Sequence, residues 1–179
     1  KGGDLTTSGH YSTGIFAQSV GGNGGVGGGS YALNTQGSGE SSGEVTVTVG
    51  GSGGDGAVAN KVTVENDASV TTTGGNAHGI YAQSVGGNGG VAGAGYALAL
   101  DGYWKPKGES TTVDLDAAIG GSGGTAAHGD TVTVTNTGDI STKTDTSYGI
   151  YAQSVGGGGG DGGQAGSHTF GYTKKEKAP

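Results

Sequence analysis

We predict an all-β fold for this chain of 179 residues, arranged as a parallel β-solenoid, because three features of the sequence agree. They are an internal repeat, short runs in which β-branched and polar residues alternate, and clusters of glycine between those runs. The composition supports this choice, since 46 residues are Gly and only 27 are Val, Leu, Ile or Phe. So few large apolar residues are unsuited to a conventional globular core, whereas a repeat array needs only small side chains in each unit.

The repeat is a nine-residue string that occurs three times. It reads Gly-Ile-Phe/Tyr-Ala-Gln-Ser-Val-Gly-Gly and begins at Gly14, Gly79 and Gly149. A related glycine cluster follows an apolar residue at five places, which are Val20, Val49, Val85, Ile119 and Val155. The intervals between these places predict about five stacked units of roughly 34 residues each.

Alternating segments predict where the strands lie. Residues 45–49, 61–65 and 130–135 place Val at every second position among Thr, Lys, Asp and Glu. A period of two over five or six residues, with many β-branched side chains, is typical of a β-strand. A 3.6-residue apolar period of useful length is missing, so we expect no amphipathic helix.

The orientation of side chains in the repeated string stays open at this point. Ile80, Ala82 and Ser84 share one face of the predicted strand 80–85. Alignment of the glycine clusters nevertheless places Tyr81 and Gln83 in the columns of residues 45, 47, 115 and 117. A one-residue bulge before the glycines would bring the apolar residues of both segments to one side.

The string Gly-Ile-Tyr-Ala-Gln-Ser-Val-Gly-Gly-x-Gly-Gly, with the lead-in Val-Thr-Val-Thr-Asn-Thr-Gly-Asp-Ile-Ser-Thr at 132–142, resembles the glycine-rich repeats of bacterial autotransporter passengers. The resemblance covers most of the chain. It implies a right-handed parallel β-helix, exported by a C-terminal β-barrel that this sequence lacks and tethered through it to the outer membrane. Residues 1–179 would then be a single solenoid segment of a larger passenger.

The role that this resemblance implies is non-enzymatic. Passengers of this group act outside the cell or at the bacterial surface in adhesion, aggregation or biofilm formation. The partners it implies are a host or sister-cell surface, a polysaccharide, or another copy of the chain. No cofactor is expected.

Composition excludes several other classes of function. The chain has no Cys, so it has neither a disulfide framework nor a thiolate that could act as nucleophile or metal ligand. Its eight basic residues are all Lys and stand against 15 acidic residues, which gives a net charge of -7. An acidic chain without arginine is a poor partner for nucleic acid, so we expect none.

The best binding candidate is an insertion at 99–114, which makes the interval between the second and third strings five residues longer than that between the first two. It carries two aromatic and two basic candidates, which are Tyr103, Trp104, Lys105 and Lys107. Aromatic residues on a loop offer a large contact area at low entropic cost. The alternative is that the loop folds back over the flank of the solenoid. The last residues, 173–179, are expected to be a disordered tail.

Weaker candidates have plain structural explanations. Asp55 and Asp161 stand in near matches to a calcium-binding nonapeptide, so a glycine-rich secreted segment ordered by calcium is an alternative function. The matches are not in tandem, and we therefore expect no metal site and an ordinary polar corner. Asp114 and Asp116 share a strand face, as the acid pair of a β-helix carbohydrate-active enzyme would, yet a solvated face is the simpler explanation. The four histidines are His10, His78, His128 and His168, and none shares a repeat position with a second His at the spacing of metal ligands. His78 is expected at a solvated corner.

Overall fold

A computed structural model describes residues 3–35, 43–101 and 113–171. Within these ranges the chain forms β-strands and no helix, so the predicted all-β class is confirmed. Every strand pair found there is parallel. Parallel pairing agrees with the prediction that like segments stack on one another.

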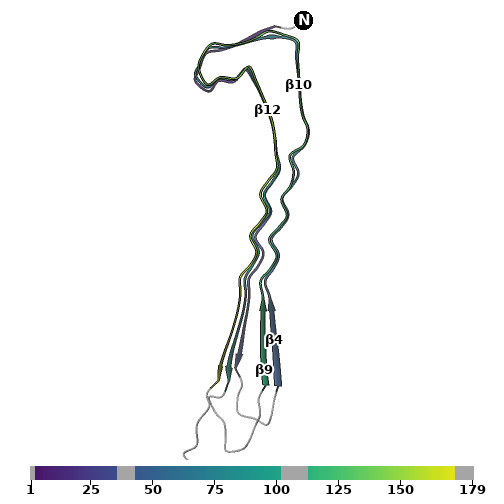
Figure 1. The fold of residues 1–179 in the computed structure, drawn as a ribbon, viewed down its shortest axis with the longest axis vertical. Coiled ribbons are helices and arrows are strands. Elements are labelled where there is room, and N and C mark those ends of the chain that lie inside the picture. Colours follow the sequence, from purple (N-terminus) through teal and green to yellow (C-terminus); the bar gives the residue numbers. More distant parts are fainter. Residues whose placement is uncertain (1–2, 36–42, 102–112, 172–179) are drawn as a thin grey trace, which may run out of the picture. The chain divides into compact units, whose positions relative to one another are not determined.

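The strands fall into three successive passes of the chain, which we number from the N-terminus (Figure 1). The first pass contains β1 (Asp4–Thr7), β2 (Ile15–Val20), β3 (Ser30–Thr35), β4 (Gly43–Val49) and β5 (Val62–Asn66). The second contains β6 (Ser69–Thr72), β7 (Ile80–Val85), β8 (Gly95–Asp101), β9 (Val113–Ile119) and β10 (Val132–Asn136). The third contains β11 (Ile140–Thr142), β12 (Ile150–Val155) and β13 (Ala165–Gly171).

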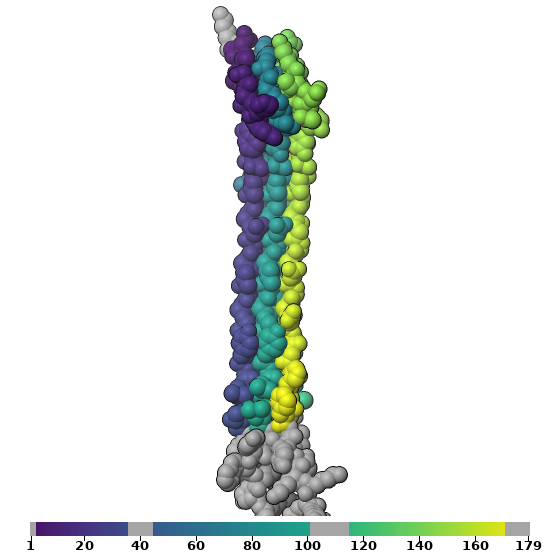
Figure 2. Space-filling view, turned by 90° about the vertical axis from the view of Figure 1, so that its left-hand side faces the viewer, coloured from purple at the N-terminus to yellow at the C-terminus, as the bar shows by residue number. Residues whose placement is uncertain are grey.

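Each strand pairs with the equivalent strand of the next pass. The sheets are β1–β6–β11, β2–β7–β12, β3–β8–β13, β4–β9 and β5–β10. Ile15 lies opposite Ile80, which lies opposite Ile150, so each string stacks on the next copy of itself. The expected unit of roughly 34 residues is therefore not the stacking unit, which is about twice as long. Figure 2 shows the passes as neighbouring purple, teal and yellow-green bands.

The described residues form two compact units. Unit 1 consists of those within Lys1–Gly24, Asp55–Gly89 and Thr125–Gly159, and unit 2 of those within Gly25–Gly54, Gly90–Gly124 and Gly160–Pro179. Unit 1 has apolar side chains inside. Val62 and Val64 of β5 pack against Ile80 and Ala82 of β7 in its core. The alternation read from the sequence places these residues on one face of each strand.

Unit 2 has the opposite arrangement. Val45 of β4 and Leu115 of β9 are exposed by 67% and 58%, while Thr48 and Asn34 on the inner faces are only 6% and 8% exposed. Strands of unit 2 therefore turn their large apolar residues outward and their small or polar residues inward. The sequence left open which face of the repeated string points inward. β7 pairs residue for residue with β2 and β12, without a bulge, and its Tyr81 column faces outward as the Val45 column does.

The glycine-rich stretches between strands have a hydrogen-bond pattern with a period of three. In unit 2, the backbone N–H groups of Gly27 and Ser30 donate to the carbonyls of Val91 and Ala94, both over 2.8 Å. In unit 1, Gly21 donates in the same way to Val85 over 2.8 Å. Donors that recur at every third residue fit the polyproline-II type of helix, which has three residues per turn and no internal hydrogen bonds. Its backbone N–H and C=O groups therefore pair with neighbouring stretches of chain.

Opposed stretches within a unit are linked by a second set of these bonds. In unit 2, Gly51 and Gly54 donate to the carbonyls of Gly28 and Gly25, over 2.8 and 2.9 Å. The order is reversed, so these two stretches run in opposite directions. Contact is so close that a Cβ on Gly27 would overlap the carbonyl oxygen of Gly51. Glycine is required at such positions because nothing larger fits between the backbones.

Candidate functional site

The binding residues predicted from sequence are not placed by the structure. Tyr103, Trp104, Lys105 and Lys107 lie outside the described residues, and so does the expected tail at 173–179. Of the predicted insertion 99–114, the first three residues belong to β8 and the last two to β9. The candidate surface of the described chain must therefore be built from the strands and the glycine stretches.

Asp55, one of the two calcium candidates, has a structural role in unit 1. Its Oδ1 accepts hydrogen bonds from the backbone N–H and the hydroxyl of Thr125, over 2.8 and 2.7 Å. These two bonds hold the pKa of the Asp55 carboxyl below its ordinary value, the backbone bond being the stronger cause. Asp161, the other candidate, belongs to unit 2, where its carbonyl accepts from Ala92 over 2.8 Å.

Asn23 and Asn88 form a similar ladder in unit 1. The Oδ1 of Asn23 accepts the backbone N–H of Asn88 over 2.9 Å, and the Oδ1 of Asn88 accepts the N–H of Gly158 over 2.6 Å. Each asparagine side chain thus accepts a backbone N–H of the next pass that the period-of-three backbone bonds do not use. Sequence reasoning missed this role, although the period of three in the glycine stretches was a signal for it.

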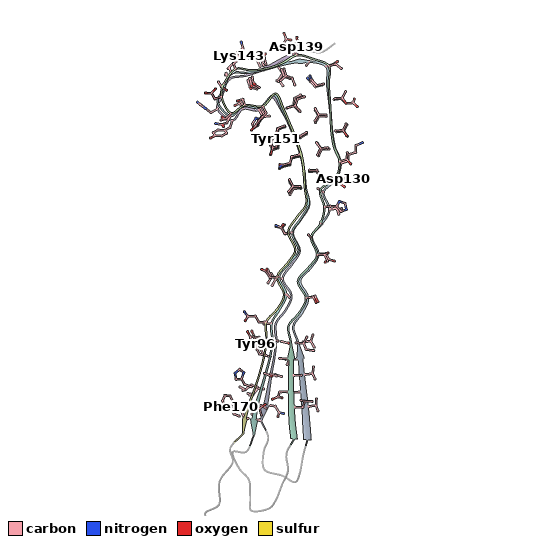
Figure 3. All side chains as sticks on the ribbon, in the orientation of Figure 1. Tyr96, Asp130, Asp139, Lys143, Tyr151 and Phe170 are labelled. Carbon is pink, nitrogen blue, oxygen red and sulfur yellow. The ribbon has the colours of Figure 1, made fainter. Side chains whose placement is uncertain are left out.

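The outward face of the β2–β7–β12 sheet carries a ladder of aromatic rings. Phe16 stacks on Tyr81 with ring centroids 5.1 Å apart, and Tyr81 stacks on Tyr151 at 4.9 Å, with interplanar angles of 10° and 12°. Figure 3 labels Tyr151, the ring of the third pass. In-register pairing of like residues produces this stack, because each ring lies above its equivalent in the neighbouring strand.

Glutamines form a second ladder on the same face. The Nε2 of Gln18 donates to the Oε1 of Gln83 over 2.8 Å, and the Nε2 of Gln83 donates to Gln153 over 2.7 Å. We call the rings of Phe16, Tyr81 and Tyr151 together with these glutamines the outer ladder. It presents aromatic edges and amide groups at the repeat of the strands, with no formal charge.

His78 extends the aromatic cluster and is not the solvated corner that we expected. It is half-buried, and its ring stacks on Tyr81 and Tyr148 with centroids 5.8 and 5.3 Å apart. Its Nδ1 accepts the backbone N–H of Tyr148 over 3.0 Å, which places the proton of the neutral ring on Nε2. The other three histidines are exposed.

Asp116 differs from its predicted role on a solvated acidic face. It is half-buried on the inner face of β9, where its Oδ2 accepts the hydroxyl of Thr169 over 3.3 Å. Its Oδ1 is buried without a partner in the described part of the chain. The side chain of Asp114 lies outside the described part of the chain, so the pairing of the two carboxylates stays a prediction.

Other polar places provide little chemistry. A groove of about 400 Å³ in unit 1 is lined by Glu65, Asn66, Asp67, Thr135 and Thr137. Asn66 is already engaged there, since its Nδ2 donates to Asn136 and to the carbonyl of Ala68.

Over 3–35, 43–101 and 113–171, no three acidic or histidine side chains gather closely enough to hold a metal ion. The same residues contain no helix of the length and hydropathy needed to cross a membrane.

Comparison with protein-family models, curated proteins and solved structures found no match to this chain.

Proposed function

We propose that the chain is a segment of a right-handed parallel β-helix that serves as a non-enzymatic scaffold at a bacterial surface, as an autotransporter passenger does. The observation that carries this proposal is the register. The same six-residue motif lies on itself in three passes, Ile15 on Ile80 on Ile150, and every residue of the motif faces its own equivalent. A chain that returns to the same place in the same direction must coil, and parallel crossovers are overwhelmingly right-handed.

The role in attachment or aggregation is supported by the outer ladder. Stacked passes repeat the same side chains at the strand spacing of about 4.8 Å, so a modest contact made by one pass is offered again by the next. Repetition of weak contacts increases total avidity without any new chemistry. The partners we propose are another cell surface, a polysaccharide or a second copy of the chain, and the proposed location is outside the cell.

Beads coated with the chain test this function. We expect coated beads to aggregate or to attach to cells, and beads that carry Phe16→Ser together with Tyr81→Ser to attach several-fold less, because these changes remove two rings of the outer ladder. The matched control is Val20→Ser, which alters the same outward face of β2 away from the rings. Circular dichroism checks that each variant keeps its β-structure. Folded chain that leaves beads unattached would refute the proposal.

The two alternatives raised by the sequence give different results in simple assays. A carbohydrate-active enzyme would release products from candidate polysaccharides. A segment ordered by calcium would lose its β signal in a chelator, whereas the proposed scaffold should keep it. The bonds from Thr125 to Asp55 favour the scaffold, since they give that carboxylate a structural use.

A further inference from the structure

Two exposed asparagines of unit 1 stand in the sequence context that deamidates most readily. Asn23 and Asn88 are each followed by Gly, and no other asparagine of the chain is. In an Asn-Gly pair the glycine nitrogen can attack the carboxamide carbon of the asparagine, because glycine has no side chain that obstructs the approach. Both asparagines are exposed, so burial does not keep water or base away from them. Their reactivity therefore depends on what holds the two reacting groups.

Stacking holds both reacting groups of the first pair on one residue of the next pass. The N–H of Gly24 donates to the carbonyl of Asn88 over 2.8 Å, and the Oδ1 of Asn23 accepts the N–H of Asn88 over 2.9 Å. To react, the glycine nitrogen must give up its proton and the carboxamide must turn toward that nitrogen. Attack therefore requires both hydrogen bonds to break.

The second pair is held in the same way one pass further along. The N–H of Gly89 donates to the carbonyl of Gly158 over 2.9 Å, and the Oδ1 of Asn88 accepts the N–H of Gly158 over 2.6 Å. Each of these locks joins two neighbouring passes and uses only groups of those passes. Further passes on either side would therefore leave both locks unchanged.

We propose that Asn23 and Asn88 are sites of spontaneous deamidation that stacking of the passes switches off. In a pass that has not stacked, the glycine nitrogen loses its proton and bonds to the Cγ of the asparagine, ammonia leaves, and a succinimide ring remains. Water then opens the ring at either carbonyl. One opening gives aspartate, and the other gives isoaspartate, in which the main chain runs through the former side-chain carbonyl. Each site consumes one water and releases one ammonia.

The two products differ in whether the pass can still stack. Aspartate at position 88 keeps an oxygen that can accept the N–H of Gly158, as the Oδ1 of Asp55 accepts that of Thr125. Isoaspartate lengthens the main chain by one carbon, which moves the N–H of Gly89 off the carbonyl of Gly158 and breaks the period of three. A chain that stays unstacked is thus altered in a way that opposes stacking. This inference does not depend on the proposed role in attachment.

Peptide mass spectrometry of the full chain tests the locks. The chain is kept at mildly alkaline pH, either folded in buffer or unfolded in urea, and the exchange of an amide for a carboxyl group is followed by mass. We expect Asn23 and Asn88 to react at least tenfold more slowly in the folded chain, because only locally opened molecules react. Asn60 is the matched control, since it is also exposed but is followed by Lys, and it should react slowly in both states. Equal rates for Asn23 and Asn88 in the two states would overturn the proposal.

Two further measurements connect the reaction to stacking. Gly87→Ala should accelerate deamidation of Asn88 in the folded chain several-fold, because the added methyl group meets the carbonyl of Gly22 and separates the stretches. Gly159→Ala, where a Cβ has no atom within 4 Å, should leave the rate unchanged. An unchanged rate in Gly87→Ala would overturn the proposal.

The second measurement uses chain aged in urea and returned to buffer, and it needs no variant if Gly87→Ala fails to fold. Limited proteolysis separates refolded from unfolded molecules, and chromatography of the peptides resolves aspartate from isoaspartate. We expect chains with aspartate at position 88 to refold and chains with isoaspartate there to collect several-fold in the unfolded fraction. Equal partition of the two products would overturn the proposal, because the backbone bond of Gly89 would then be unnecessary for stacking.

Discussion

Replacement of Gly87 by Ala should destabilise unit 1, because three segments meet there without room for a methyl group. A Cβ at Gly87 would overlap the carbonyl oxygen of Gly22 and lie 3.0 Å from the backbone nitrogen of Ala57. Both obstacles are backbone atoms, which cannot move aside as a flexible side chain would. The opposed stretches must separate to admit the methyl group.

The size of the effect follows from the bonds at stake. Gly87 donates its N–H to the carbonyl of Ala57 over 2.9 Å and accepts the N–H of Ala127 over 3.0 Å. Loss of two net hydrogen bonds costs about 1–3 kcal/mol, and an overpacked contact costs about 1–3 kcal/mol more. We expect Gly87→Ala to lower the free energy of unfolding by about 2–4 kcal/mol when part of this strain relaxes.

Gly159 provides the matched control, since no atom lies within 4 Å of a Cβ built there. The same substitution at this position restricts the unfolded chain and should stabilise the fold by about 0.4–1 kcal/mol. Urea unfolding followed by far-ultraviolet circular dichroism measures both changes by linear extrapolation. Equal effects for the two variants, or a larger loss for Gly159→Ala, would refute the close packing of the glycine stretches.

Two further pairs of measurements test the core and the carboxylate of unit 1. Ile80→Ala should cost about 2–5 kcal/mol in the same urea assay, as for a buried residue, whereas Ile150→Ala should cost under about 1 kcal/mol, because Ile150 is 46% exposed. Similar losses would contradict this difference in burial. The bonds from Thr125 lower the pKa of Asp55 in the folded chain, so their stabilisation is present above the ordinary value of 3.8 and is lost as the pH falls through the folded-state pKa. Asp55→Asn should therefore lose less stability on acidification than the parent, and an unchanged acid dependence would count against this bond.

The sequence predicted the all-β class, the parallel stacking of like segments and the approximate positions of many strands. These predictions succeeded because alternation in segments such as Val62-Thr63-Val64 reports directly on a half-buried strand, and because the repeated string aligns with itself. The orientation of β7 was left open by the sequence, because two alignments placed different residues inside, and the structure places Ile80 and Ala82 in the core.

The same logic failed in unit 2 for a physical reason. A period of two tells which residues share a face, but it does not tell which face points inward. Val45 and Leu115 are exposed because the interior between these sheets holds the smaller Thr48 and Asn34. Which face points inward depends on the distance between the opposed backbones, and the closely packed glycine stretches keep this distance small. The sequence of a single strand does not contain that information.

Duplicating segments of the chain tests which repeat stacks, the pass seen in the structure or the shorter unit of roughly 34 residues predicted from the sequence. The apparent repeat arises because opposed glycine stretches share one pattern, although they run in opposite directions and donate to each other, as Gly51 does to Gly28. Insertion of a second copy of residues 80–149 after Gly149 adds one complete pass in register and should raise the urea midpoint, since each added repeat contributes a new interface. Insertion of a second copy of residues 86–119 after Ile119 keeps the local pattern of an apolar residue followed by two glycines. It nevertheless places a forward stretch where a return stretch belongs, so the midpoint should fall. A higher midpoint for the shorter duplication would show that the stacking unit has been assigned wrongly.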